Sequence, residues 1–232
     1  MDFPDLHSWN LSPKDAIALQ KALAGRVEVH DRLVEPVRLV AGVDVSSARC
    51  GASVHAAVVV YDLDRSVLVA TAAASLEAAF PYVPGLLSFR ELPVVLAAFR
   101  RLAATPDVVL VDGQGIAHPR RFGIACHLGV HTGIPAIGCA KSRLIGTYQE
   151  PGQEKGCWSP LQHDGVEIGA VLRTRTGVKP LFISPGHLVT LADALAMVLR
   201  CCTRWRLPEP VRKADHAAEE AKRDLGASGD MV

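Results

Sequence analysis

Three apolar runs of strand length dominate the first third of the chain, and polar or charged residues bound each of them. They cover residues 38–46, 54–62 and 66–75. The polar stretch 62–65 predicts a hairpin turn, so the second and third runs should pair antiparallel. A helix should precede them, because Ser12 is a typical N-cap residue and Pro13 suits the first helical position. This helix is expected to end near Ala24.

The period of the pattern changes at Ser88, where apolar residues begin to recur at helical spacing. These residues are Phe89, Leu92, Val95, Leu96 and Phe99. Glu91 is then expected in the first turn, and Pro93 near the start, because a helix interior tolerates proline poorly. The next predicted elements are a strand at 107–112, a helix at 121–129 and a strand at 136–140. Such alternation predicts a right-handed βαβ unit.

The last part of the chain is predicted to contain a second hairpin and two helices. They comprise strands at 168–173 and 180–184, a helix at 191–204, and an Ala/Glu/Lys-rich helix after Pro208. Thr190 and Asp193 form a capping-box signature before the first of these helices. Residues 226–232 are expected to be a disordered tail, which leaves a single domain over residues 1–225.

Acidic residues follow two of the predicted buried strands. Asp44 comes after the apolar residues 39–43, and Asp112 comes after residues 108–111. A carboxylate in such a place is costly unless it is paired or binds a cation, and oxygen ligands on a rigid sheet suit Mg²⁺ or Mn²⁺. Three antiparallel strands, then alternating helices and parallel strands, with acids on the first and fourth strands, is the order of the ribonuclease-H-like α/β fold. The pattern therefore predicts a metal site for phosphodiester chemistry on a mixed sheet flanked by helices.

Composition excludes several classes of protein. Of the 232 residues, 49% are apolar and 21% charged, which is typical of a globular protein. The chain has no run of ~18 apolar residues that could span a membrane, and its acidic start is unlike a signal peptide, so we expect a cytoplasmic protein without a membrane partner. A net charge of +1 argues against a protein that coats nucleic acid through its overall charge. We therefore expect a monomer that contacts nucleic acid through local patches.

The cysteines do not form a metal-binding pattern. They are Cys50, Cys126, Cys139, Cys157, Cys201 and Cys202, with no C-x-x-C pair among them. We therefore expect reduced, mostly buried thiols rather than a zinc site.

Five motifs, in consistent order between about Leu6 and about Glu220, together resemble the endonuclease V family of inosine-directed nucleases. They are Pro81-Tyr82-Val83-Pro84-Gly85, Phe89-Arg90-Glu91, the stretch from Val111-Asp112-Gly113-Gln114-Gly115 to His118-Pro119-Arg120, Gly138-Cys139-Ala140-Lys141-Ser142 and Ser184-Pro185-Gly186-His187. The resemblance implies cleavage of single- or double-stranded DNA at the second phosphodiester bond 3′ to deoxyinosine. The products would carry 3′-hydroxyl and 5′-phosphate ends for repair of deaminated adenine. It also implies Mg²⁺ as cofactor, with Mn²⁺ able to substitute.

The resemblance assigns catalytic and metal-binding roles. The implied metal ligands are Asp44, Glu91, Asp112 and, as the fourth, Asp215. His216 is the neighbouring alternative, because some family members have histidine there. Lys141 should lie beside the scissile phosphate, whereas its structural alternative is a surface lysine. Asp44 is the candidate bridge between two ions, and a one-metal reaction assisted by Lys141 remains open. Asp15 and Asp193 have capping explanations instead.

The resemblance also assigns substrate contacts. The residues that would surround an extruded base are Gly85, Leu87, Gly113, Gly115 and Leu144. His118 would lie near the metal or a phosphate. The residues that would contact phosphates are Arg120, Arg121, Arg143 and Lys141. Tyr82, held between Pro81 and Pro84, is the candidate wedge that fills the space left by the base. Turn glycines, core leucines, a core tyrosine and surface arginines are the structural alternatives. His187 is interpreted as a loop hydrogen bonder outside the catalytic set.

Two other functions are compatible with these residues. A nuclease of the same fold could act mainly on inosine-containing RNA, because discrimination of the 2′-hydroxyl depends on the wall of the pocket. A noncatalytic inosine-binding or scaffold protein would require the acids and Lys141 to be unused.

Overall fold

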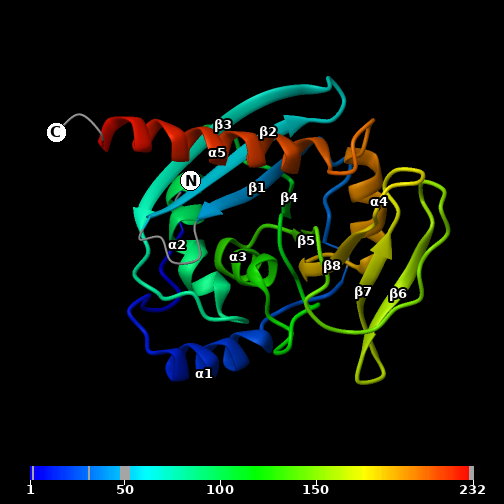
Figure 1. The fold of residues 1–232 in the computed structure, drawn as a ribbon, viewed down its shortest axis with the longest axis horizontal. Helices are drawn as coiled ribbons and strands as arrows, with labels where there is room; N and C mark the ends of the chain where they lie inside the picture. The colour runs from blue at the N-terminus through cyan, green and yellow to red at the C-terminus, as the bar shows by residue number, and fades with distance from the viewer. Residues whose placement is uncertain (2, 31, 48–52, 230–232) are drawn as a thin grey trace.

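The three apolar runs of the first third form antiparallel strands at one side of a mixed sheet. In this computed structural model the described residues are 1, 3–30, 32–47 and 53–229, and within them eight strands are ordered β3-β2-β1-β4-β5-β8-β7-β6 (Figure 1). The first three are β1 (Leu39–Ser47), β2 (Ser53–Asp62) and β3 (Val67–Glu77). β2 pairs antiparallel with both β1 and β3, which confirms the predicted meander. The predictions for Cys50 and residues 230–232 lie outside the described residues.

The predicted alternation of strand, helix and strand is confirmed in the middle of the chain. Its elements are β4 (Val108–Val111), α3 (Ile124–Thr132) and β5 (Ala136–Ala140). β4 pairs parallel with β1 on one side and with β5 on the other. The sheet therefore changes from antiparallel to parallel pairing at β1, the strand that carries Asp44.

The far side of the sheet contains one strand more than predicted. Its strands are β6 (Trp158–His163), β7 (Val166–Leu172) and β8 (Leu181–His187), and the predicted antiparallel pairing of β7 with β8 is confirmed. β6 was missed because Pro160 interrupts its pattern. Proline is tolerated in an edge strand, and β6 is the last strand of the sheet order.

Helices cover both faces of the sheet (Figure 1). They are α1 (Pro13–Ala24), α2 (Leu87–Arg100), α4 (Leu191–Cys201) and α5 (Glu209–Gly229), in addition to α3. Alternate residues of a strand point to opposite faces, so Val109 packs with α2 and α3, whereas Leu110 packs with α4 and with Val211 of α5. The predicted caps are confirmed, since Ser12 and Thr190 each accept a backbone hydrogen bond at the start of their helix.

A close crossing brings α5 to the sheet. A Cβ atom at Gly42 of β1 would lie 2.1 Å from the carbonyl oxygen of Pro210, so a larger residue would push the first turn of α5 away. Asp44 lies on the same face as Gly42, two residues along the strand. The glycine therefore lets α5 bring its polar side chains to the acid of β1.

Several boundaries differ from the sequence-based expectations, among them the end of α4 at Cys201 rather than at residue 204. α2 begins at Leu87, so Glu91 lies beyond the first turn and Pro93 lies inside the helix. α3 begins only at Ile124, because Arg121 has φ 55° and Gly123 is the N-cap. The structure continues α5 to Gly229, where we expected a tail from residue 226, since adding residues to an existing helix is far easier than starting one.

The helices of the described residues include none with the length and apolar character needed to cross a membrane.

Candidate active site

The parallel pairing of β1 with β4 brings two acids together. The paired residues end at Val43 and Val111, and the backbone N–H of Asp112 donates to the carbonyl oxygen of Val43 at 3.0 Å. Asp44 and Asp112 therefore leave neighbouring strands at the same level. Asp215 joins them from α5, and one carboxylate oxygen from each of these three residues lies within 4.8 Å of the others. His216 is exposed and is not part of this group.

Lys141, the first residue after β5, lies between two of these carboxylates. Its Nζ is 2.6 Å from Oδ2 of Asp112 and 2.8 Å from Oδ1 of Asp215. Burial alone would lower the pKa of the ammonium group, but the charge and hydrogen bond of Asp112, helped by Asp215, raise it above its ordinary value. Lys141 is therefore a charged group inside the acid cluster rather than an isolated surface lysine.

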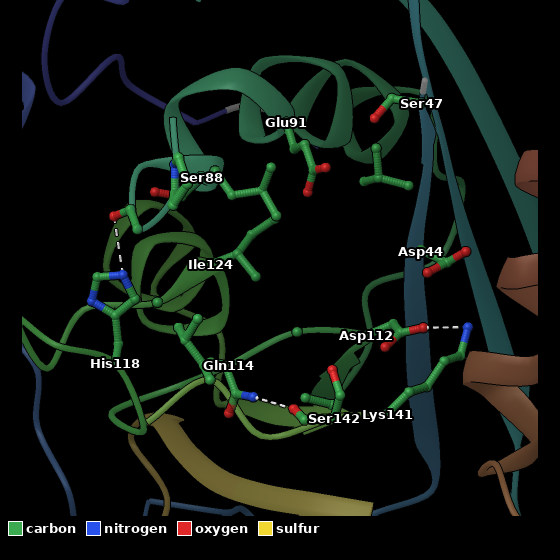
Figure 2. A pocket seen from close by; sticks show the side chains of 18 of the residues that line it. Asp44, Ser47, Ser88, Glu91, Asp112, Gln114, His118, Ile124, Lys141 and Ser142 are labelled. Atoms are coloured by element: carbon green, nitrogen blue, oxygen red, sulfur yellow. Dashed lines mark hydrogen bonds and ion pairs between the residues drawn. The ribbon is translucent and has the colours of Figure 1, made fainter. Parts of the chain in front are cut away.

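The acids are crowded and partly removed from water. Burial, and then the charge of Asp112, raise the pKa of Asp44 to about 8. Glu91 reaches toward the same space from α2 and is 9% exposed, and burial raises its pKa to about 8 as well (Figure 2). Both shifts arise because a carboxylate loses hydration and meets like charge. The charged forms of these acids need a cation to stabilise them.

These residues fit a divalent cation. Carboxylate oxygens are the ligands that Mg²⁺ and Mn²⁺ prefer, and three of them converge here from two strands and a helix. The raised pKa of Asp44 is an independent sign of the fit, because a bound cation would favour its deprotonated form. Glu91 lies outside the close group of three but faces the same space.

The acid cluster opens into a pocket of about 650 Å³, a volume typical of small-ligand sites. Figure 2 shows Asp44, Asp112 and Lys141 on one side of the pocket and His118 on the other. The predicted site residues that line it are Asp44, Tyr82, Gly85, Leu87, Glu91, Asp112, Gly113, His118, Lys141, Arg143, Leu144 and Asp215. Tyr82 and Leu144 are 41% and 47% exposed, so neither is a core residue.

A network of hydrogen bonds holds the loop that contains Gly85. The carbonyl oxygen of Gly85 accepts from Nη2 of Arg120 at 2.7 Å, from Nε2 of His118 at 3.0 Å and from Nε2 of Gln20 at 3.2 Å. Burial, with the nearby Arg120, lowers the pKa of His118 to about 4, so the ring is neutral at pH 7. Gly85 itself has φ 78°, a conformation that favours glycine. This part of the pocket therefore has an uncharged inner surface, and hydrogen bonds from side chains outside it hold its loop in place.

Four residues with predicted substrate contacts lie outside the lining of this pocket. Among the residues that the structure describes, the pocket lining does not include Pro81, Gly115, Arg120 or Arg121. Gly115 packs against the backbone of Pro185 in β8, because a Cβ there would lie 2.0 Å from the carbonyl oxygen of Pro185. Arg120 braces Gly85, and Arg121 donates to the carbonyl oxygen of His163 at 3.2 Å. Both guanidinium groups are thus engaged by the protein itself.

Several lining residues were not anticipated. Examples are Gln20, Ser88, Gln114, Glu219 and Lys222. Gln114 donates from Nε2 to the carbonyl oxygen of Ser142 at 2.9 Å, and Glu219 hydrogen-bonds Ser46. A signal existed only for α5, where Asp215, Glu219 and Lys222 follow the helical spacing of one face. Gln20 could not be found from sequence, because its contacts are with Gly85 and Phe122.

The sheet order and the acids on β1 and after β4 define a ribonuclease-H-like protein with an acidic site. The family model for endonuclease V matches residues 21–216. The chain belongs to the endonuclease V family.

Individual relatives agree with this assignment. Endonuclease V of Trichormus variabilis is 50% identical over 212 residues, which are 91% of this chain and 96% of that protein. The crystal structure of endonuclease V from Streptomyces avermitilis has a TM-score of 0.90 at 44% identity and covers 94% of this chain and 96% of that one. The Ciona intestinalis endonuclease V, in complex with a 24mer DNA containing an inosine followed by a ribo-adenosine, has a TM-score of 0.79 at 25% identity, covering 91% of this chain and 98% of that one.

Proposed function

We propose that this protein recognises deoxyinosine in DNA and hydrolyses the second phosphodiester bond 3′ to it, with a divalent cation as cofactor. The products would carry 3′-hydroxyl and 5′-phosphate ends and would start repair of deaminated adenine. The observation that carries the proposal is that a crowded carboxylate cluster and an uncharged, glycine-containing pocket wall share one cavity. The Ciona relative in complex with inosine-containing DNA supports the choice of substrate.

The acids are proposed to hold the cation. Asp44, Asp112 and Asp215 would bind Mg²⁺ or Mn²⁺, and Glu91 would contribute from α2. When bound, such an ion lowers the pKa of a water nucleophile and stabilises charge on the departing oxygen. A cation on Asp112 and Asp215 would compete with the ammonium group of Lys141, which becomes available to a phosphate oxygen.

The opposite wall is proposed to select the base. Hypoxanthine lacks the exocyclic amine of guanine, so a close-fitting pocket excludes guanine by collision and accepts hypoxanthine. Gly85 and Gly113 line the pocket where such a close approach is needed. Tyr82 is exposed at the rim, where its ring can fill the space that an extruded base leaves in the stack.

Nicking of a labelled duplex with a single deoxyinosine tests the proposal directly. We expect cleavage with Mg²⁺, no cleavage with EDTA, and no cleavage of the matched duplex that has deoxyadenosine at the same position. The position of the cut and the chemistry of the new ends are read from the product on a sequencing gel. Equal cleavage of both duplexes, or activity that resists EDTA, would contradict it.

An RNA-directed activity is the second candidate. The Ciona complex favours it, because a ribo-adenosine follows the inosine in that DNA. Matched DNA, RNA and chimeric oligonucleotides, each with one inosine, separate the two functions. Faster cleavage of the all-RNA strand than of the all-DNA strand would replace the DNA-repair role with an RNA-processing one.

A further inference from the structure

Three side chains form a hydrogen-bonded series from the N-terminal segment to the wall of the pocket. Nε2 of His7 lies 2.8 Å from Nε2 of His127 in α3, and Nδ1 of His127 lies 3.1 Å from Oγ of Ser88 in α2. Ser88 lines the pocket (Figure 2), and in the described part of the chain the structure gives its hydroxyl no second hydrogen-bond partner. Nδ1 of His7 lies 2.9 Å from the carbonyl oxygen of Ser8. The catalytic proposal uses none of these groups.

The bond from His7 to Ser8 sets the direction of the whole series. A carbonyl oxygen only accepts, so Nδ1 of His7 must carry a proton. When His7 is neutral, its Nε2 is therefore a lone pair and must accept from Nε2–H of His127. Nδ1 of His127 is then a lone pair as well, and the hydroxyl of Ser88 donates to it. In this state Ser88 presents only lone pairs to the pocket.

Protonation of His7 reverses the two hydrogen bonds between the side chains and leaves the bond to Ser8 unchanged. Both nitrogens of His7 then carry protons, and Nε2–H donates to Nε2 of His127. His127 stays neutral with its single proton on Nδ1, which donates to Oγ of Ser88. The hydroxyl proton of Ser88 must then point away from His127. The uptake of one proton thus turns Ser88 from an acceptor into a donor.

We propose that Ser88 contacts the base held in the pocket, and that the protonation of His7 decides, through His127, whether its hydroxyl accepts or donates there. The contact with a base rests on the proposed function, whereas the reversal of the series does not. Ser88 is then a specificity-determining residue, and His7 and His127 are positioning residues that act through it.

The surroundings of the series give His7 and His127 different degrees of burial. His127 is fully buried, and burial, with the neighbouring His7 and His131, holds its pKa well below its ordinary value. His7 is only half-buried and packs against Trp9 and against Phe89 of α2. His131 of α3 also contacts the His7 ring. The charged groups that act on His131 are Asp5 of the N-terminal segment and Arg100 of α2, which form an ion pair of 3.4 Å. Of the two rings, only that of His7 is in contact with solvent, from which a proton can come.

The direction of the Ser88 hydroxyl matters for the choice between hypoxanthine and adenine. Hypoxanthine has an N–H donor at N1, whereas adenine has a lone pair at the same position. A hydroxyl that accepts favours hypoxanthine and leaves the lone pair of adenine unpaired. A hydroxyl that donates favours adenine. Discrimination should therefore be strongest while His7 is neutral.

The reversal is tested in the ligand-free protein by NMR of ¹⁵N-histidine. Long-range ¹H–¹⁵N correlations should show His127 protonated on Nε2 at about pH 8 and on Nδ1 at about pH 5, with a midpoint that matches the titration of His7. In the His7→Phe variant, which keeps a ring beside Trp9, one tautomer should persist across this range. A single His127 tautomer at all pH values in the wild-type protein would overturn the reversal.

The contact with the base is tested by binding. Affinities for single strands with deoxyinosine or deoxyadenosine at one position are compared in Ca²⁺ between about pH 5 and about pH 8. We expect the preference for deoxyinosine to fall about fivefold on acidification, the worth of about one hydrogen bond. The Ser88→Ala and His7→Phe variants should show a preference that does not change with pH.

Ser75→Ala is the matched control, because Ser75 hydrogen-bonds Nδ1 of His55 at 2.9 Å outside the pocket lining. It should keep the wild-type profile. A Ser88→Ala profile identical to that of the wild type would overturn the contact with the base. Absence of any preference for deoxyinosine would contradict the proposed function and the contact together, while the NMR result would still decide the reversal.

Discussion

Two walls of the pocket differ in what stabilises them. The acid wall consists of Asp44, Asp112 and Asp215 with Lys141. Its carboxylates repel one another, and the ammonium group of Lys141 partly neutralises their charge. The glycine wall consists of Gly85, Gly113 and His118. It is held by hydrogen bonds to the carbonyl oxygen of Gly85, from the neutral His118 ring and from the Arg120 guanidinium, and by close packing. The acid wall is therefore sensitive to cations and pH, whereas the glycine wall is sensitive to the volume of a side chain. The proposed function, cleavage next to a chosen base, would use both kinds of surface in one cavity.

The largest effect should come from removing an acid. Asp44→Ala and Asp112→Ala each take a carboxylate from the cation site, and a lost metal contribution of several kcal/mol lowers the nicking rate on the order of 10³-fold. Deoxyinosine binding, which we propose depends on the other wall, should persist in a filter-binding or anisotropy assay. Asp15→Ala is the control, because Asp15 belongs to the cap of α1. Full nicking activity in either variant would refute the metal assignment.

A smaller loss is expected at the rim. Tyr82→Ala removes a ring that is 41% exposed, and stacking of a base on an aromatic side chain is worth about 1–3 kcal/mol. The variant should lose preference for deoxyinosine sites in competition with undamaged DNA, while its Mg²⁺ titration stays unchanged. Tyr82→Phe keeps the ring and should behave like the wild type. An unchanged preference in the alanine variant would argue against a wedge.

Two substitutions distinguish an effect on the shape of the glycine wall from an effect of backbone strain alone. Gly85 and Gly177 have φ 78° and 71°, so alanine at either should cost about 1–2 kcal/mol of folding stability. Only at Gly85 does the added Cβ meet a neighbour within 4 Å, namely Nη2 of Arg120 at 2.8 Å. Chemical denaturation should show a similar loss in both variants. Only Gly85→Ala should weaken deoxyinosine binding, and equal binding by both would show that this wall does not shape the base site.

The last effect is on folding stability rather than on activity, and it is a dependence on pH. The pKa values of Asp44 and Glu91 are raised to about 8 in the folded protein, so between about pH 4 and about pH 8 the folded state binds more protons than the unfolded chain. The free energy of unfolding of the metal-free protein should therefore fall as pH rises through this window. Asp44→Asn and Glu91→Gln should flatten the slope.

Mg²⁺ provides the matching control for this pH dependence. It should stabilise the wild-type protein more at about pH 8 than at about pH 5, because it binds the deprotonated acids. Thermal unfolding with and without Mg²⁺ measures both effects. A metal-free stability that rises toward pH 8 would contradict the burial of these two acids.

Local patterns were sufficient for most of the fold. Apolar runs predicted β1 to β5, and helical spacing with capping residues predicted α1, α2 and α4, because strand and helix periods follow from which positions are buried. The misplaced features have local causes that need the structure. Pro160 interrupts the strand pattern of β6, an edge strand, and the left-handed backbone conformation of Arg121 prevents α3 from beginning there. Both depend on backbone conformations that a residue pattern does not specify.

The sequence by itself determined which acids could gather, since Asp44 and Asp112 follow apolar runs that must be buried, and it determined the family through its motifs. Only the tertiary structure decided how they meet. The parallel register of β1 with β4 aligns the two acids, and the close crossing at Gly42 brings Asp215 rather than His216 to them. The tertiary structure also places Arg120 in a hydrogen bond with the carbonyl oxygen of Gly85 and connects His7 to Ser88 through His127. These contacts join residues far apart in the chain, and packing, not sequence spacing, sets their distance.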